Sequence, residues 1–314
     1  MAQREAQTLL TDRLVLGTAQ LGMAYGIANR AGQPAEAEAH ALVAAALARR
    51  FAGFDTAAAY GDSEAVLGRA FEALGVSDRV RVVSKGSAVP AGRETLTTHV
   101  TASLHRLGVP RLSAWLLHDE KHVAHWTREV AAEAEALRAS GRVEAFGLSA
   151  YHPASALRAM EQHGFTALQF PASPLDRRFL REPVIGRLGR AAGSLFVRSV
   201  YLQGLCLLPP ARVPDSIVRG REAVQTLHDF CAHRGLARDH FCLHYVLQRT
   251  SAVGARLVVG AESPLQLERN AALLSAPSLD PAHLEDWDAL WPEDIDELVL
   301  PYRWPARREV ASAA

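Results

Sequence analysis

The sequence predicts an α/β fold, a (β/α)8 TIM barrel, from two observations. Strand-like and helix-like segments alternate along almost all of the 314 residues, in eight pairs. The strand-like segments are apolar throughout, without a strict alternation of apolar and polar residues, which is typical of parallel strands buried on both faces. Eight such units close naturally into one barrel of about 250 residues. An open, doubly wound sheet is the alternative.

The expected strands are short apolar runs, and an expected helix with apolar residues at helical spacing follows each of them. The strands cover residues 14–19, 53–56, 80–85, 112–118, 143–149, 166–170, 194–202 and 255–260. The helices cover residues 36–50, 63–74, 94–107, 127–140, 154–163, 178–192, 218–249 and 264–275. Boundary signals support several helices: Ser63 stands at a potential N-cap, Gly141 and Gly164 close helices, and Pro264 starts the last one.

No shift in composition marks a domain boundary, so residues 1–314 are expected to form one domain. Its barrel core covers about 14–276, and a tail covers 277–314. The tail is rich in aromatic residues and does not follow the barrel pattern. It packs over the barrel wall or caps the substrate site, and the sequence supports both interpretations.

Composition excludes several classes of function. The formal net charge is zero, which gives no basic field for nucleic acid or for an anionic membrane. No apolar run approaches the roughly 18 residues that a membrane span needs, and no signal peptide is visible. Three cysteines without CxxC spacing indicate a reducing, cytoplasmic location and no disulfide framework. His240, Cys242 and His244 point to different sides of a helix, so no metal site is expected.

Ionisable side chains end three consecutive expected strands. Asp55 ends the second, Lys85 the third and His118 the fourth, and Tyr60 follows Asp55 on its loop. Because the carboxyl ends of barrel strands meet at one rim, we expect these four side chains within a few ångströms of one another. An acid and a phenol on one loop are suited to proton transfer.

The stretch from Asp55 to Gly68 reads D-T-A-x-x-Y-G-x-S-E-x-x-L-G. It resembles the signature of the aldo-keto reductases, barrel enzymes that reduce carbonyls with a nicotinamide cofactor. The resemblance implies that Tyr60 is the general acid/base and that Lys85 lowers the phenol pKa. It also implies that Asp55 fixes Lys85 and that His118 orients the carbonyl oxygen.

The resemblance extends over residues 14–270 and implies a set of cofactor-binding residues. Arg198 stands where many members stack an aromatic ring on the nicotinamide, and a guanidinium plane can stack in the same way. Ala150 replaces the usual Asn of the motif that holds the nicotinamide amide. The implied cofactor residues are Gly17, Thr18, Asp55, Ser149, Gln169, Arg198, Gly260, Glu262, Gln266, Arg269 and Asn270.

The resemblance implies NADP(H), but the loop after the eighth strand carries Glu262 and Gln266 where basic residues are common. A carboxylate repels a 2′-phosphate and accepts a hydrogen bond from a ribose hydroxyl, so NAD(H) is the alternative. Arg269 is the nearest cation in this loop.

We expect a small carbonyl substrate, either an aldehyde, a ketone or a sugar, at Tyr25, Tyr60 and His118, and a monomer or weak homo-oligomer. Two other interpretations compete with this one. The first is a regulatory or scaffold barrel that binds nicotinamide with little catalysis. The second is a cofactor-free lyase that uses Lys85 as a Schiff-base amine.

Overall fold

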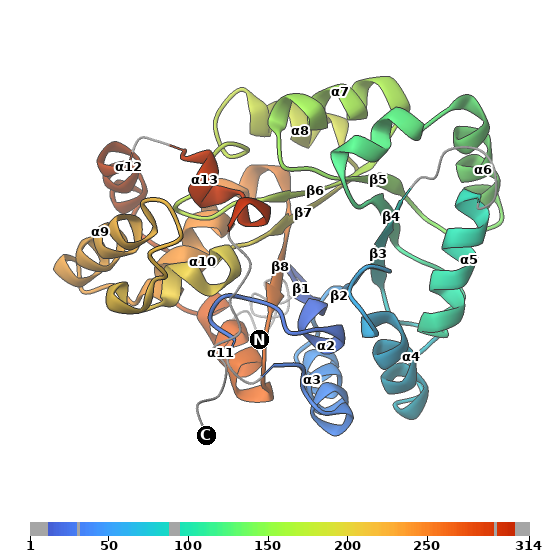
Figure 1. The fold of residues 1–314 in the computed structure, drawn as a ribbon, viewed down its shortest axis with the longest axis horizontal. Helices are drawn as coiled ribbons and strands as arrows, with labels where there is room; N and C mark the ends of the chain where they lie inside the picture. The colour runs from blue at the N-terminus through green and yellow to red at the C-terminus, as the bar shows by residue number, and fades with distance from the viewer. Residues whose placement is uncertain (1–11, 30–31, 88–94, 292–293, 305–314) are drawn as a thin grey trace, which may run out of the picture.

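Eight parallel strands form a closed barrel in the computed structural model, in the order β1 to β8. The structure describes residues 12–29, 32–87, 95–291 and 294–304. The pairing of β1 with β8 closes the sheet, with Gly17 beside Gly260. Figure 1 shows the helices arranged around this barrel. The barrel prediction is therefore confirmed, and the open-sheet alternative is wrong.

Most of the strands are shorter than the sequence pattern predicts. They are β1 (Leu14–Gly17), β2 (Gly53–Asp55), β3 (Val82–Gly86), β4 (Ala114–Leu117), β5 (Phe146–Ser149), β6 (Ala167–Pro171), β7 (Ser194–Arg198) and β8 (Arg256–Gly260). Alternate side chains point inward and form a small inner core that includes Val83, Leu116 and Phe196. The other face packs against the helices in a much larger core. Burial on both faces explains why the strands lack polar alternation.

The helices follow the strands in the expected alternation. They are α2 (Ala19–Gly22), α3 (Glu36–Ala48), α4 (Ser63–Ala73), α5 (Leu96–Leu107), α6 (Arg128–Ala139), α7 (Pro153–His163), α8 (Val184–Ala191), α9 (Gly220–His233), α10 (Arg238–Arg249), α11 (Pro264–Leu274), α12 (Pro281–Leu290) and α13 (Asp296–Val299). The helical stretch expected over 218–249 consists of two helices, because Gly235 adopts a φ of 64° and separates α9 from α10. This break matters for the site, since it places the first turn of α10 beside the cavity described below.

Ser63 does not act as an N-cap. It is the first residue of α4, and its hydroxyl donates to the carbonyl oxygen of Thr18 over 2.8 Å. The same hydroxyl lies 3.0 Å from the hydroxyl of Thr56. Ser63 therefore ties the loop after β1 to the loop after β2, and these are the loops that carry much of the candidate site.

The tail packs on the barrel through α12. The fully buried Trp287 donates its indole N–H to the carbonyl oxygen of Pro174 over 2.8 Å and contacts the rings of Phe230 and Phe241. Figure 1 shows α9, α10, α12 and α13 gathered on one side of the molecule. This part of the tail fits the interpretation of packing over the barrel wall.

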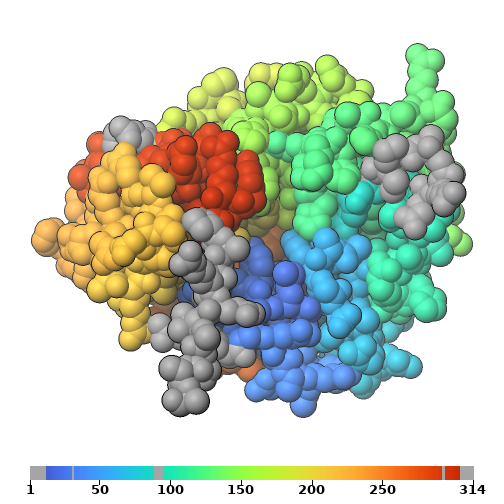
Figure 2. All heavy atoms as spheres, viewed as in Figure 1, coloured from blue at the N-terminus to red at the C-terminus, as the bar shows by residue number. Residues whose placement is uncertain are grey.

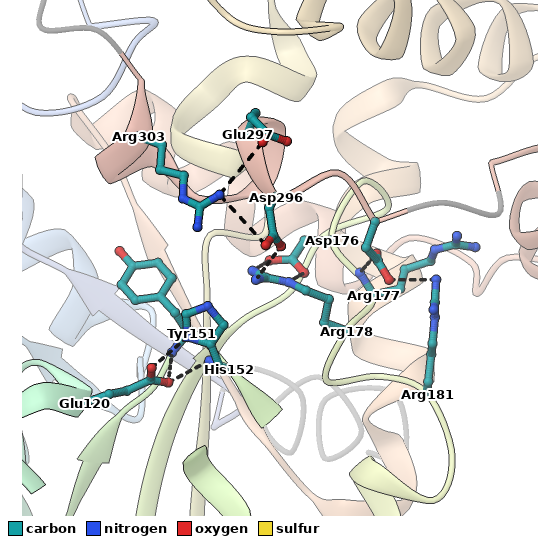
Figure 3. Close-up of polar contacts among 11 residues, drawn as sticks. Glu120, Tyr151, His152, Asp176, Arg177, Arg178, Arg181, Asp296, Glu297 and Arg303 are labelled. Atoms are coloured by element: carbon teal, nitrogen blue, oxygen red, sulfur yellow. Dashed lines mark hydrogen bonds and ion pairs between the residues drawn. The ribbon is translucent and has the colours of Figure 1, made fainter. Parts of the chain in front are cut away.

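The segment 294–304 reaches further, to the loops that follow β5 and β6. In Figure 2 the region around α13, in red, lies between the orange surface of α9 and the green surface formed by the middle of the chain. Arg178, which follows β6, pairs with Asp296 over 3.7 Å, and Figure 3 shows both side chains. Tyr302, in the 3-10 helix η5 (Pro301–Arg303), meets Tyr151 edge to face at 5.0 Å between ring centroids. The tail therefore both packs on the barrel and reaches its rim.

Candidate active site

A cavity of about 560 Å³ opens at the carboxyl ends of the strands, where a barrel of this type carries its functional site. Eleven of the residues expected at the site line it. They are Gly17, Thr18, Tyr25, Asp55, Tyr60, Arg198, Gly260, Glu262, Gln266, Arg269 and Asn270. The expected residues Lys85, His118, Ser149 and Gln169 are not part of this lining.

A buried ion pair, Lys85 with Asp55, lies at the end of the cavity that Tyr60 lines. Lys85 is fully buried, and its ammonium donates to both carboxylate oxygens of Asp55 and to the carbonyl oxygen of Thr56, each over 2.8 Å. These bonds use all three ammonium protons. Gln169 on β6 donates its amide to the same carboxylate over 2.6 Å. Asp55 therefore holds Lys85 as the sequence predicts, and a second strand holds Asp55.

Tyr60 lies directly above this pair. The Lys85 nitrogen is 4.9 Å from the centroid of the Tyr60 ring, and the ring meets the His118 imidazole edge to face at 5.4 Å. The strand ends thus bring Asp55, Tyr60, Lys85 and His118 together.

The expectation that Lys85 lowers the pKa of Tyr60 stays a prediction, because the net shift of the phenol pKa has other, larger causes. Burial, followed by the Asp55 carboxylate, raises the pKa of the phenol above its ordinary value of 10. Lys85 directs its protons to Asp55 and Thr56, so it does not hydrogen-bond the phenol oxygen. Tyr60 is accordingly a neutral proton donor near pH 7.

His118 is neutral at the same pH. Burial lowers the pKa of its imidazole to about 3, and the positive charges of Lys85 and Arg198 add to this effect. A neutral imidazole carries one N–H donor and one acceptor nitrogen. His118 is therefore suited to donate one hydrogen bond to an oxygen beside Tyr60, and it adds no charge.

Two glycines allow the Tyr60 loop to approach the loop after β1. A Cβ atom on Gly22 would lie 1.9 Å from the carbonyl oxygen of Tyr60 and 2.3 Å from the backbone nitrogen of Ser63. Gly61 has a φ of +52°, and a Cβ atom there would lie 2.2 Å from the carbonyl oxygen of Gly22. Only glycine fits this contact, which fixes the backbone that carries the phenol.

Residues outside the predicted set organise the opposite end of the cavity. The amide of Gln20 donates to the carbonyl oxygens of Gly17 and Ala261 over 3.0 and 2.7 Å, and so joins the loops after β1 and β8. Arg238 donates to the carbonyl oxygens of residues 206, 207 and 208, in the 3-10 turn η2 (Leu202–Leu207) and just after it. Sequence reasoning missed Arg238 because it treated 218–249 as one helix, which hides the start of α10.

Arg269 is ion-paired. Its guanidinium donates to Asp239 at the start of α10 over 2.7 Å. In the same region the side-chain oxygen of Gln266 accepts from the backbone N–H of Glu262 over 2.7 Å. The expected cation of this loop is thus neutralised by a neighbouring carboxylate, and Gln266 shapes the loop. Asn270 donates weakly to the carbonyl oxygen of Gly260, over 3.4 Å.

Ser149 ends β5, and Gln169 lies opposite it in the middle of β6; both are buried. The side-chain carbonyl oxygen of Gln169 is a buried acceptor with no hydrogen-bond partner among the described residues. A buried acceptor without a donor is costly, so this oxygen suits a ligand that brings an N–H group. A carboxamide has such a group.

Arg198 ends β7 and does not extend freely into the cavity. Its guanidinium lies over the ring of Tyr151 at 4.1 Å from the centroid and donates to the carbonyl oxygen of Ala150 over 3.3 Å. One face of the guanidinium plane is thus covered by protein. The expected stacking of Arg198 on a nicotinamide stays a prediction, for which the other face is left.

The described residues contain no group of three or more potential ligands that could hold a metal ion. Nor does this part of the chain contain a helix with the length and apolarity needed to span a bilayer.

Comparison with known proteins identifies similar sequences. A model of the Aldo/keto reductase family matches residues 13–292. A 6-dehydroglucose reductase of Agrobacterium fabrum is 30% identical over 161 residues, which cover 46% of this chain and 53% of the relative. Two mycobacterial aldo-keto reductases are 40% and 36% identical, and the matched segments span only about a third of their length, 31% and 35%.

Solved structures share the fold. A glycerol dehydrogenase of Gluconobacter oxydans superposes with a TM-score of 0.67 at 19% identity, over 90% of this chain and 94% of that one. An aldo-keto reductase of Klebsiella pneumoniae in complex with NADPH gives a TM-score of 0.66 at 21% identity, over 89% and 91% of the two chains. At these identities the likeness concerns the fold alone.

Proposed function

Because the chain belongs to the aldo/keto reductase family, we propose that it is an oxidoreductase that transfers a hydride between NAD(P)H and a carbonyl compound. The substrate class is an aldehyde, a ketone or a sugar. One observation carries the proposal: Tyr60, a proton donor at neutral pH, lies between the buried Lys85–Asp55 pair and the neutral His118.

The residues at the cavity fit a nicotinamide cofactor, and NADP(H) is the form that the family implies. The NADPH bound to the Klebsiella relative supports this choice. In this chain the unpartnered oxygen of Gln169 would accept from the carboxamide, and Ser149 lies beside it. The loops joined by Gln20 would hold the remainder. When bound, the nicotinamide supplies the hydride.

The protein groups then manage the proton. In the reductive direction Tyr60 donates its phenol proton to the carbonyl oxygen as negative charge develops there, and His118 donates a hydrogen bond to the same oxygen. The phenolate that remains on Tyr60 lies beside the Lys85 ammonium, 4.9 Å from the ring centroid, which stabilises it. Asp55 keeps that ammonium in place.

Replacing the phenol tests this proposal. Tyr60→Phe should lower kcat for carbonyl reduction by roughly 10²–10⁴-fold, because general acid catalysis contributes about that factor. Affinity for NADPH, measured by fluorescence titration, should stay within about twofold. Tyr245→Phe is a matched control, since this buried phenol bonds Asp288 and does not line the cavity. A Tyr60→Phe protein that keeps most of its activity would refute the assignment.

The two competing interpretations give different results in the same assays. A regulatory or scaffold barrel would bind NAD(P)H without reducing any carbonyl in a broad substrate panel. A Schiff-base lyase would become covalently labelled when borohydride is added with substrate. The geometry opposes the lyase, because Lys85 is fully buried and its three protons bond Asp55 and Thr56.

Cofactor preference has its own test. NADPH and NADH are titrated separately, with Glu262→Gln as the variant and Glu135→Gln, on the outer helix α6, as the control. Since Glu262 lines the cavity and Arg269 is paired with Asp239, removing the Glu262 charge should raise affinity for NADPH relative to NADH. An unchanged ratio would mean that the 2′-phosphate does not approach Glu262.

A further inference from the structure

Arg198 is a cation in the cavity wall, and the proton transfer proposed above assigns no step to its charge. It lines the cavity together with Asp55 and Tyr60. Its guanidinium donates a hydrogen bond to the backbone carbonyl oxygen of Ala150, and among the described residues no carboxylate pairs with it. Guanidinium groups in protein interiors are normally paired, so this arrangement invites an anionic ligand.

The guanidinium is held in place before any ligand arrives. The Tyr151 ring supports one of its faces at 4.1 Å, and Tyr302 meets that ring edge to face at 5.0 Å. The backbone N–H groups of Tyr151 and His152 donate to one carboxylate oxygen of Glu120, each over 2.6 Å. Figure 3 shows Glu120 beneath these two residues.

The segment that carries Tyr302 is anchored as well. Asp296 pairs with Arg178 over 3.7 Å and with Arg303 over 3.9 Å. Arg178 in turn makes two 2.8 Å hydrogen bonds to the buried Asp176. Figure 3 shows this network above the Tyr151 loop. Because Tyr151 and Tyr302 are held in place, the Arg198 side chain that rests on them loses little conformational entropy when it binds a ligand.

The residues around Tyr60 do not neutralise the positive charge of Arg198. Lys85 and Asp55 neutralise each other, and Tyr60 and His118 are neutral. The Arg198 charge lowers the pKa of Tyr60 and of His118, so it acts on the groups that flank the reacting carbonyl. Together, Asp55, Tyr60, Lys85, His118 and Arg198 therefore carry one net positive charge.

We propose that Arg198 binds a carboxylate of the substrate, so that the preferred substrate is an acidic carbonyl compound, such as an oxo acid or an aldehyde acid. The planar fork of the guanidinium matches a carboxylate with two parallel hydrogen bonds. Tyr60 and His118 then receive the carbonyl oxygen of the same molecule. This inference rests on the proposed function and names its substrate class.

The test compares two aldehydes of similar shape, the anionic 4-carboxybenzaldehyde and its neutral methyl ester, methyl 4-formylbenzoate. The wild-type protein should reduce the acid with a kcat/KM at least ~10-fold above that of the ester, since hydrogen bonds to charged groups are worth about that factor or more. Arg198→Met should abolish this preference. The ratio of the two kcat/KM values cancels any common effect on cofactor binding. Arg138→Met, on the exposed face of α6, is the control and should keep the preference.

A binding measurement separates failure of this inference from failure of the proposed function. Calorimetric titration with benzoate and with benzamide needs no turnover, and benzoate should bind at least ~10-fold more tightly in wild type but not in Arg198→Met. Equal affinities for benzoate and benzamide in wild type, or an acid preference that survives in Arg198→Met, would overturn this inference. Neither result would contradict the proposed reductase function. A loss of NADPH affinity in Arg198→Met with an unchanged acid-to-ester ratio would also overturn it, because the guanidinium would then serve the cofactor phosphates.

Discussion

Removing Lys85 should destabilise the whole protein and not only its activity. Lys85→Met keeps most of the side-chain volume but deletes an ammonium with three hydrogen bonds of 2.8 Å. The Asp55 carboxylate, which is 4% exposed, would still accept a hydrogen bond from the side-chain amide of Gln169. A buried carboxylate that loses its partner costs about 3–5 kcal/mol.

The partner substitution should have a similar effect, and the two should not add. Asp55→Asn leaves the buried ammonium without its carboxylate, which again costs about 3–5 kcal/mol. In the double variant neither charge remains, so we expect a loss of roughly 1–3 kcal/mol from the missing hydrogen bonds. The coupling energy in the double-mutant cycle should therefore exceed about 3 kcal/mol.

Urea denaturation at pH 7, followed by circular dichroism, measures the free energy of unfolding of the four proteins. Refolding yield is checked first, because the cycle requires reversible unfolding. If the single losses add within about 0.5 kcal/mol, the two residues do not act as a pair and the electrostatic argument for the site fails. A loss below about 1 kcal/mol for Lys85→Met would refute the stated burial cost.

Three further predictions concern His118, Gly22 and Tyr302. Because the folded protein holds the pKa of His118 at about 3, below its ordinary 6.5, the unfolded state binds more protons and stability falls as pH drops from 6.5 toward 3. In the His118→Asn variant the free energy of unfolding, measured by urea titration, should fall by roughly 2–4 kcal/mol less than in wild type between pH 6.5 and pH 3. The same pH dependence in both proteins would contradict the low pKa. Gly22→Ala places a Cβ atom 1.9 Å from the carbonyl oxygen of Tyr60, so it should cost ~1–3 kcal/mol and lower kcat, whereas Gly193→Ala, with nothing nearer than 3.5 Å, should do neither. Tyr302→Ala removes a ring contact worth about 1 kcal/mol, so stability should fall by no more than about that amount and the acid-to-ester ratio by up to roughly fivefold. An unchanged ratio would mean that Tyr302 does not position the guanidinium.

The sequence predicts the barrel and the four central residues for the same reason. In a closed parallel barrel every strand ends at one rim, so Asp55, Lys85 and His118 are brought together by strand order alone. Tyr60 follows because a short loop leaves it little room to move away. None of these placements depends on details of side-chain packing.

Features that depend on packing could not be predicted in this way. The direction of the Tyr60 pKa shift follows from burial and then from the Asp55 carboxylate, and the motif does not show how deeply the phenol is buried. Asp239 pairs with Arg269 only because the chain breaks at Gly235 and starts a new helix beside the cavity. A pattern of apolar residues continues through that break and hides it.

The contact between Tyr302 and Tyr151 has a consequence for how the protein is made. Asp55, Tyr60, Lys85 and His118 all lie within the first 118 residues, whereas the support of the opposite wall comes from residue 302. During synthesis the proton-transfer groups leave the ribosome long before this wall is complete. The residues proposed for proton transfer and those proposed for substrate selection therefore lie in different parts of the chain. Exchanging the C-terminal part of the chain between related barrels would therefore change which substrates are accepted and leave the proton-transfer residues unchanged.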